Sequence, residues 1–223
     1  MRMDGNQAVV IGGGAAGMMA AAAAAENGRP VILLEKNEKL GKKLYITGKG
    51  RCNVTNACGR DKFFENIVSN PKFLYSAFHT FDNKRLEIFL ENNGCHLKEE
   101  RGERVFPASD HASDVTAAFE RFLRNSGVQV RLRCEVRSVE TDSEKITGVI
   151  LADGSVIPAD TVIVATGGLS YPSTGSTGDG HRMARELGHK VTDCVPALVS
   201  LETEEDWCKK LQGLSLKNVT LTM

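Results

Sequence analysis

Glycines with the spacing of a phosphate-binding turn stand near the start of the chain, in the run Ile11-Gly12-Gly13-Gly14-Ala15-Ala16-Gly17. They follow the apolar run 8–11 and open an alanine-rich stretch expected to be a helix over 15–27. In such a turn Gly12 permits the sharp bend, Gly14 leaves room for a pyrophosphate, and Gly17 lets the helix lie close to the sheet. The N–H groups of Ala15 and Ala16, at the helix start, would face the phosphates.

An acidic residue follows the next apolar run at the distance that this turn requires. The run 31–34 predicts a second strand, and Glu35 stands at its carboxyl end, about 20 residues beyond the glycines, where an acid accepts hydrogen bonds from ribose hydroxyls. Strand, turn, helix, strand and acid together predict a βαβ unit that binds an adenine dinucleotide.

The uncharged stretch 8–25 also resembles a membrane span or the apolar core of a signal peptide. Glycine and alanine contribute little to lipid partitioning, three glycines cluster where a spanning helix needs apolar side chains, and the preceding Arg2-Met3-Asp4 is not clearly basic. The sequence therefore favours a buried strand and helix.

Composition predicts a globular, soluble, cytoplasmic protein. A chain of 223 residues with 41% hydrophobic content can bury a core and form one or two domains. Its 28 basic and 28 acidic residues cancel, so we expect no nucleic-acid and no membrane partner. The six cysteines and five histidines lack metal-site spacing, so we expect reduced thiols and no metal.

The remaining chain predicts an α/β fold. A polar, glycine-rich stretch occupies 39–56, where a long loop is costly to order unless it binds something. Helices are expected over 71–81, 83–92, from Asp114 to Gly127, and over 177–187. Strands are expected over 104–107, 128–132 and 161–165, with a β-meander formed by 136–139, 146–151 and 156–157.

Four motifs together resemble a known family. They are Gly12-Gly13-Gly14-Ala15-Ala16-Gly17, Gly48-Lys49-Gly50-Arg51-Cys52-Asn53-Val54-Thr55-Asn56, Arg104-Val105-Phe106-Pro107-Ala108-Ser109 and Ala165-Thr166-Gly167-Gly168. The chain resembles bacterial FAD-dependent oxidoreductases of the BaiN-like, or aminoacetone-oxidase-like, family, and corresponds to about the N-terminal half of a usual member. The resemblance implies a Rossmann-like FAD-binding domain.

The resemblance also implies which residues bind FAD. It places Gly12, Gly14 and Gly17 with Ala15 and Ala16 at the pyrophosphate, Glu35 at the ribose, and Arg51, Cys52 and Asn53 at the flavin side. Val136 matches the position whose backbone meets adenine, and Ala165, Thr166 and Gly167 match a strand end near the adenosine and pyrophosphate. The expected cofactor-binding set also includes Lys36.

The chain departs from the family pattern in two places. Lys49 stands where family members commonly have a third glycine. The C-terminal flavin-contacting segment and the return strand of the FAD domain are missing, so we expect a fragment. Residues 1–195 would form an incomplete FAD-binding domain, and 196–223, ending in the alternating run 219–223, would begin an inserted, mostly β substrate or cap domain.

Several individual residues leave two interpretations open. Arg51 is a cofactor contact or a loop cation paired with a neighbouring acid. Cys52 is a packing residue or, with Cys58, a redox thiol. His181 is a general acid or base or a solvated helix residue. The segment 174–178 is a phosphate-binding nest or a helix cap.

We therefore expect a FAD-dependent oxidoreductase that transfers hydride through the flavin, acts on a small molecule of unknown identity, and uses NAD(P)H as a possible external reductant. One alternative is an NAD-binding dehydrogenase domain, which the long excursion over 39–56 disfavours. Another is a non-catalytic, nucleotide-binding remnant.

Overall fold

The computed structural model describes residues 7–143, 145–196, 202, 204–216 and 219–220. The chain forms two compact units, Met1–Lys190 and Val191–Met223, and each is described by itself. The first unit carries all of the expected cofactor-binding residues. The expected boundary after residue 195 stays a prediction.

A four-stranded parallel sheet forms the centre of the first unit. Its strands are β1 (Ala8–Ile11), β2 (Val31–Leu34), β6 (Gln129–Arg131) and β10 (Thr161–Val164), in the order β10-β1-β2-β6. Every residue of β1 and β2 is buried, which explains their continuous apolar sequence, since a parallel strand in this position is covered on both faces. The predicted βαβ unit is confirmed, and β10 lies beside β1 with Ala8 opposite Thr161.

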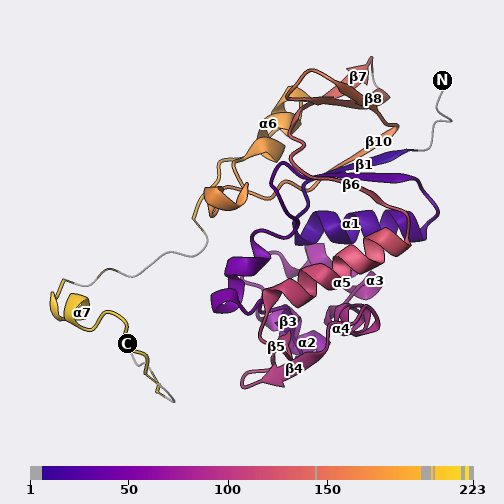
Figure 1. The fold of residues 1–223 in the computed structure, drawn as a ribbon. Coiled ribbons are helices and arrows are strands. Elements are labelled where there is room, and N and C mark those ends of the chain that lie inside the picture. The colour runs from indigo at the N-terminus through magenta and orange to yellow at the C-terminus, as the bar shows by residue number, and fades with distance from the viewer. Residues whose placement is uncertain (1–6, 144, 197–201, 203, 217–218, 221–223) are drawn as a thin grey trace. The chain divides into compact units, whose positions relative to one another are not determined.

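Helices α1 (Ala15–Glu26) and α5 (Ala112–Asn125) cover one face of this sheet (Figure 1). Met18 on α1, Leu33 on β2 and Phe119 on α5 belong to one buried cluster. Helix α5 begins two residues before the predicted Asp114, whose carboxylate instead accepts a hydrogen bond from Ser109 Oγ (2.6 Å) within the first turn. Helix α1 has 12 residues, and in the described part of the chain no helix is long and apolar enough to cross a membrane.

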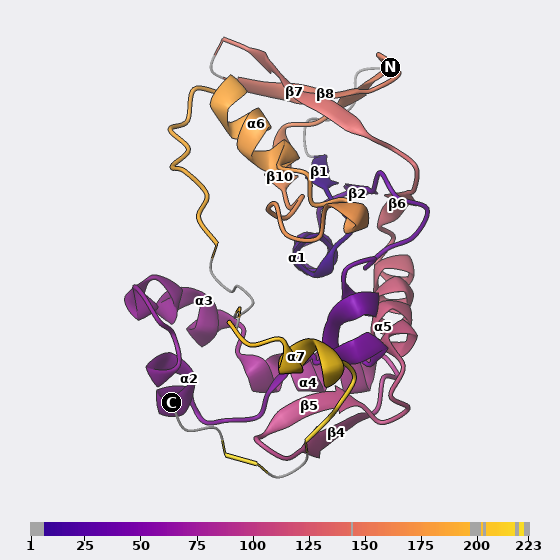
Figure 2. The same ribbon diagram turned by 90° about the vertical axis from the view of Figure 1, so that its left-hand side faces the viewer.

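The predicted β-meander covers the other face, together with α6 (Asp179–Glu186) (Figure 2). It consists of the antiparallel strands β7 (Val136–Asp142), β8 (Lys145–Leu151) and β9 (Val156–Pro158). Val149 and Met183 pack with Val9 and Leu34 of the parallel sheet. The parallel sheet therefore lies between two layers, and only its strand ends are left to form a site.

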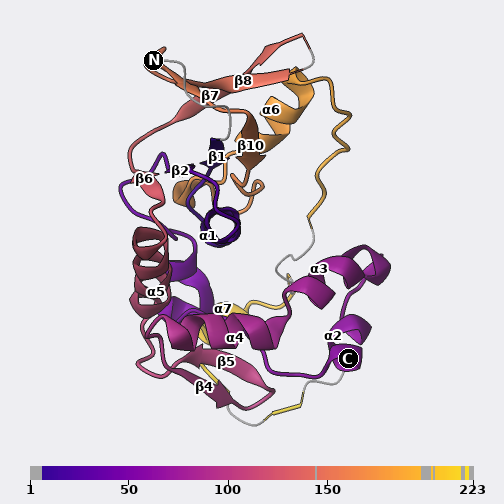
Figure 3. The ribbon, with the colours of Figure 1, turned by 90° about the vertical axis from the view of Figure 1, so that its right-hand side faces the viewer.

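A separate group of short strands and helices includes the end of the polar stretch after β2 and the segments that follow it. A three-stranded antiparallel sheet in the order β3-β5-β4 comprises β3 (Thr55–Asn56), β4 (Leu97–Glu100) and β5 (Arg104–Pro107). Figure 3 shows α5 running from the level of β6 to this sheet. Strand β4 was not predicted because Leu97 is its one apolar residue, so it has no alternating pattern.

Short helices complete this group of elements. They are η1 (Leu44–Gly50), α2 (Arg60–Glu65), η2 (Pro71–Leu74), α3 (Tyr75–Thr80) and α4 (Asn83–Asn92), and a further turn, η3 (Pro172–Thr174), precedes α6. Helix α4 has the predicted bounds, and Asp82 caps it by accepting a hydrogen bond from the Arg85 N–H (2.8 Å). Helix α2 was not predicted.

The second unit contains one short helix, α7 (Trp207–Lys210), and no strand among the residues that the structure describes there. Of the expected β run over 219–223, Val219 and Thr220 are not in a strand and 221–223 lie outside the described residues. The mostly β character of this unit stays a prediction.

Candidate functional site

A cavity of about 310 Å³ opens where β1, β2 and β10 end. This is the edge at which parallel α/β sheets bind their ligands. Ten of the expected cofactor-binding residues line it: Gly12, Gly14, Ala15, Ala16, Glu35, Lys36, Val136, Ala165, Thr166 and Gly167.

The glycine turn after β1 has a different constraint at each of its three positions. Gly12 has φ +103°, and a Cβ there would lie 2.6 Å from the Ala165 carbonyl oxygen. A Cβ on Gly17 would lie 1.7 Å from the Gly12 carbonyl oxygen, so Gly17 contacts protein and does not line the cavity. A Cβ on Gly14 would meet nothing within 4 Å, which leaves the backbone before α1 open to a ligand.

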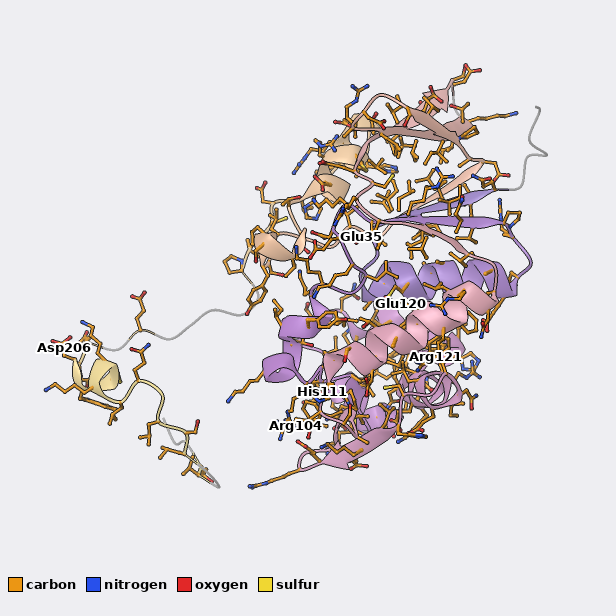
Figure 4. The ribbon with its side chains drawn as sticks, in the orientation of Figure 1. Glu35, Arg104, His111, Glu120, Arg121 and Asp206 are labelled. Atoms are coloured by element: carbon orange, nitrogen blue, oxygen red, sulfur yellow. The ribbon has the colours of Figure 1, made fainter. Side chains whose placement is uncertain are left out.

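Glu35 is buried at the end of β2, where Figure 4 shows it beside the carboxyl edge of the sheet. Its Oε2 accepts a hydrogen bond from the Gly13 N–H (2.7 Å). Its Oε1 accepts two hydrogen bonds from Asn37, from the backbone N–H (2.8 Å) and from Nδ2 (2.7 Å). The carboxylate therefore connects the glycine turn to the segment after β2.

Lys36 forms an ion pair across the cavity wall. Its Nζ donates to Asp179 Oδ2 (2.7 Å) and to Thr177 Oγ1 (2.8 Å), which joins the end of β2 to the start of α6. Burial raises the pKa of Asp179, but the hydrogen bond and the charge of Lys36 outweigh it, so the pKa lies below its ordinary value. The ammonium of Lys36 is thus already paired with protein groups.

Sequence reasoning missed several residues that line the cavity. Lys42 and Lys43 are half-buried, and Lys43 Nζ donates to the Ser170 carbonyl oxygen (2.8 Å). Thr47 and Cys134 also contribute to the wall. The pair Lys42-Lys43 directly after Gly41 was a usable signal, because two cations beside a phosphate-binding turn are well placed for an anionic ligand.

The strand end after β10 and the start of β7 close the remaining sides of the cavity. Thr166 Oγ1 is buried in this wall and has no hydrogen-bond partner among the described residues. Burial raises the pKa of the Cys134 thiol, which precedes Glu135 and the buried Val136. Thr174, Gly175 and Ser176 also line the cavity, so part of the expected segment 174–178 does face it.

Arg51, Cys52 and Asn53 do not line this cavity. Arg51 forms ion pairs with Glu100 (2.8 Å) and Asp110 (3.1 Å), which is the loop-cation interpretation. Cys52 is buried, is not in a disulfide, and has its pKa raised by that burial, so the structure favours the packing interpretation. Cys52 and Asn53 instead line a second, apolar cavity of about 180 Å³ that shares Ala15 and Leu44 with the first.

The geometry fits a dinucleotide. The first N–H groups of α1 have no intrahelical acceptor, and the N-cap, Gly14, has no side chain that could satisfy them. Cavity, open helix N-terminus and buried acid lie together, as phosphate and ribose require. Among the described residues no group of His, Cys, Asp or Glu could hold a metal ion.

Known proteins resemble this chain over most of its length. A 3-dehydro-bile acid delta(4,6)-reductase of Clostridium scindens is 36% identical over 82% of this chain and 44% of that protein. A ribosomal RNA dihydrouridine synthase of Escherichia coli is 31% identical over 96% of this chain and 52% of that protein. The chain thus spans about half the length of these curated relatives.

Solved structures share the fold. Mycobacterium smegmatis Sdh1 in complex with UQ1 is 20% identical over 81% of this chain and 38% of that chain, with a TM-score of 0.62. An open conformation of a flavocytochrome c3 fumarate reductase is 23% identical over 82% of this chain and 40% of that chain, with a TM-score of 0.55. The expected Rossmann-like α/β fold is confirmed.

The names of the relatives also bear on the expected partners. The name of the Clostridium scindens relative includes a bile acid, and a small-molecule substrate for this chain stays a prediction. The name of the Escherichia coli relative includes ribosomal RNA, and the absence of a nucleic-acid partner for this chain also stays a prediction.

The family match extends over residues 6–221 and is to the HI0933-like protein Rossmann domain. Both the expected cofactor, FAD, and the resemblance seen in the four motifs agree with this match. The chain belongs to the HI0933-like protein Rossmann domain family, a family of flavoprotein oxidoreductases.

Proposed function

We propose that this chain is the FAD-binding part of a reductase that saturates a carbon–carbon double bond conjugated to a carbonyl group. The observation that carries the proposal is the cavity at the strand ends, where Gly14 leaves the N-terminus of α1 open. When bound there, FAD supplies hydride transfer, while the protein supplies position and electrostatics.

Each part of the cavity has a role in this proposal. The N–H groups of Ala15 and Ala16 hold the pyrophosphate, with Lys42 and Lys43 as counter-charges. Glu35 Oε2 accepts one hydrogen bond from protein and, as a carboxylate oxygen with two lone pairs, has one left for a ribose hydroxyl. The backbone at Val136 faces the adenine.

The wall formed by Ala165, Thr166 and Gly167 lies beside the adenosine and pyrophosphate in this arrangement. Lys36 holds Asp179 and so fixes this wall.

The relatives suggest the reaction class. One is named a delta(4,6)-reductase of a 3-dehydro-bile acid and the other a dihydrouridine synthase. Both names describe the saturation of a ring double bond next to a carbonyl, which adds one hydride and one proton across that bond. We propose a small molecule with this feature as the substrate and NAD(P)H as the external reductant, and RNA is the second candidate substrate because of the relative's name.

The first test is a visible absorption spectrum of the purified chain before and after FAD is added, followed by release and identification of any nucleotide. Retained FAD with a flavin spectrum supports the proposal. Binding of NAD in place of FAD supports the dehydrogenase alternative, and binding of ADP alone supports a non-catalytic remnant. Oxidation of NADPH by the loaded chain, with a uridine-containing oligonucleotide or a steroid enone as acceptor, then distinguishes the two substrate classes.

A further inference from the structure

The segment from Thr47 to Asn53, which we call the clamped loop, has an unusual backbone. Lys49 (φ 58°) and Cys52 (φ 64°) are non-glycine residues in the left-handed region, and Gly48 and Gly50 also have positive φ. Side chains destabilise this conformation, so it persists only where surrounding contacts hold it. The contacts that hold this loop can be identified.

Arg51 makes the largest number of polar contacts in the clamped loop. Its Nη1 donates to Glu100 Oε1 (2.8 Å) and Asp110 Oδ1 (3.1 Å), and its Nη2 donates to Glu100 Oε2 (3.3 Å). The guanidinium carbon lies 4.0 Å from the centroid of the Phe106 ring. The planar guanidinium group can donate two parallel hydrogen bonds to one carboxylate and stack on a ring at the same time, and a lysine ammonium cannot do this.

The acids that Arg51 contacts are held in turn. Lys98 Nζ donates to Asp110 Oδ2 (2.6 Å) and lies 3.8 Å from Glu100 Oε1. The hydrogen bond from Lys98, with that from Arg51, keeps the pKa of Asp110 below its ordinary value. Two cations and two carboxylates therefore form one network between the clamped loop and strand β4.

The other side chains of the clamped loop also contact protein. The Asn53 side-chain amide donates to the Thr55 (3.1 Å) and Val105 (3.3 Å) carbonyl oxygens. A Cβ on Gly48 would lie 3.0 Å from Phe106 Cε1, so the ring lies against both Gly48 and Arg51. Thr47, by contrast, lines the nucleotide cavity, and Asn53 lines the second cavity.

From these contacts we infer that Arg51 is a positioning residue: it acts through Glu100 and Asp110 to hold the backbone of the clamped loop beside the cofactor, and does not itself bind the cofactor. This inference rests on the proposed FAD site. It differs from the role implied by the family resemblance, in which Arg51 belongs to the flavin side.

Two measurements on the same variants test the inference. The first is FAD affinity, followed by flavin fluorescence, for Arg51→Ala, Arg51→Lys, Glu100→Gln and Arg51→Ala/Glu100→Gln. The second is the rate at which a lysine-specific protease cuts the exposed Lys49–Gly50 bond in the FAD-free chain, followed by mass spectrometry. Arg104→Ala is the matched control, since Arg104 also lies over Phe106 (5.8 Å) but forms no ion pair with Glu100 among the described contacts.

We expect Arg51→Ala to weaken FAD binding and to speed cleavage after Lys49, each about tenfold, and Arg51→Lys to restore little of either. Glu100→Gln should produce about a threefold change, and the double variant should resemble Arg51→Ala alone, because two residues that act through one contact are not additive. Arg104→Ala should leave both measurements unchanged.

A direct cofactor contact gives the opposite pattern and would overturn the inference. Arg51→Lys would then restore FAD affinity, Glu100→Gln would leave it unchanged, and cleavage after Lys49 would not respond to Arg51→Ala. If the wild-type chain binds no FAD, the proposed function fails by itself. The protease rates then decide whether Arg51 holds the loop, and unchanged rates contradict that as well.

Discussion

Two segments of this chain each contain several glycines but differ in what their side chains do. Residues 12–17 have almost no side chain, and their backbone faces a cavity. The clamped loop has charged and polar side chains, and these contact the β3-β5-β4 sheet and its neighbourhood. The glycine turn thus presents its backbone to a ligand, whereas the clamped loop is held through its side chains.

The difference shows that the residues of a motif can serve to hold the backbone in one conformation, and not only to contact a ligand. Gly12 and Gly17 are required by close approach, and Gly14 by the space that a ligand needs. Arg51 and Asn53 contact protein on either side of Cys52, whose left-handed backbone needs such support. Substitutions in the two segments should therefore fail in different ways.

The largest effect is expected from Gly17→Ala, where folding and binding should be lost together. Its Cβ would lie 1.7 Å from the Gly12 carbonyl oxygen, so α1 must move away from the turn. We expect a loss of about 3 kcal/mol in the free energy of unfolding, as for a severe overpacking change. Urea denaturation followed by circular dichroism measures this free energy. Gly28→Ala is not a suitable control, because Gly28 has φ +76°, a conformation that alanine adopts poorly.

Gly59→Ala supplies the control for that experiment, because Gly59 has an ordinary φ and a Cβ added there would meet nothing within 4 Å. Its stability should stay within about 0.5 kcal/mol of the wild type. A Gly17→Ala chain as stable as this control would show that the turn after β1 is not a close-packed junction.

The next largest effect is expected from Gly14→Val, which should separate binding from folding. Gly14 has φ −77° and ψ −175°, an extended conformation that valine adopts readily, and a Cβ added there would meet no protein atom within 4 Å. Stability should fall by less than about 1 kcal/mol, because valine is a weaker N-cap residue than glycine. FAD affinity should fall by about a hundredfold, because the side chain occupies the approach to the helix N-terminus. FAD titration and thermal unfolding of the same sample measure both quantities.

An unchanged affinity in Gly14→Val would mean that FAD does not reach the N-terminus of α1. It would also remove the contrast with the clamped loop, since neither segment would then face the cofactor. A fall in stability with no change in FAD affinity would assign Gly14 to protein packing, like Gly17.

A smaller effect is expected at the ion pair that closes the cavity. Asp179→Asn removes the charge partner of Lys36 and should lower the free energy of unfolding by about 1 kcal/mol at neutral pH. Because the pKa of Asp179 is lowered in the folded protein, the ion pair contributes its full stability above the ordinary pKa of 3.8. That stability is lost as the pH falls through the lowered pKa. The wild type and Asp179→Asn should therefore differ in stability at pH 7 and converge below pH 3.8.

Denaturation at a series of pH values checks this, with Asp206→Asn as the control. Asp206 pairs with Lys209 (2.8 Å) on an exposed helix end in the second unit, where an ion pair contributes little. A difference between the wild type and Asp179→Asn that persists unchanged at low pH would show that the carboxylate charge is not the source of the stability.

The sequence predicted the parts of this molecule that follow a local rule. Strands β1 and β2, helix α4 and the cavity-lining glycines follow from apolar runs, helical spacing and the turn that a pyrophosphate requires. Glu35 was found by its distance from the glycines, and it does line the cavity. In each case a few neighbouring residues carry the information.

The parts that could not be predicted depend on distant contacts. The partners of Arg51 lie 49 and 59 residues further along the chain, and no local pattern connects them. Asp179 and Lys36 are 143 residues apart. Strand β4 forms because β5 offers it an edge, and its own sequence, with one apolar residue, gives no signal.

The smallest expected effect is a gain of stability, at Lys49 in the clamped loop. Its left-handed φ of 58° costs a lysine free energy that glycine does not incur, and its side chain is exposed and has no partner among the described contacts. Lys49→Gly should therefore raise the free energy of unfolding by about 0.5 kcal/mol, since the relief of strain exceeds the entropy that glycine adds to the unfolded chain.

Lys72→Gly is the control, because Lys72 is also exposed but lies inside η2, where glycine should destabilise the protein. Urea denaturation of both variants gives the two signs. A Lys49→Gly chain that is less stable than the wild type would show that the lysine side chain itself supports the loop, in addition to the contacts of Arg51 and Asn53.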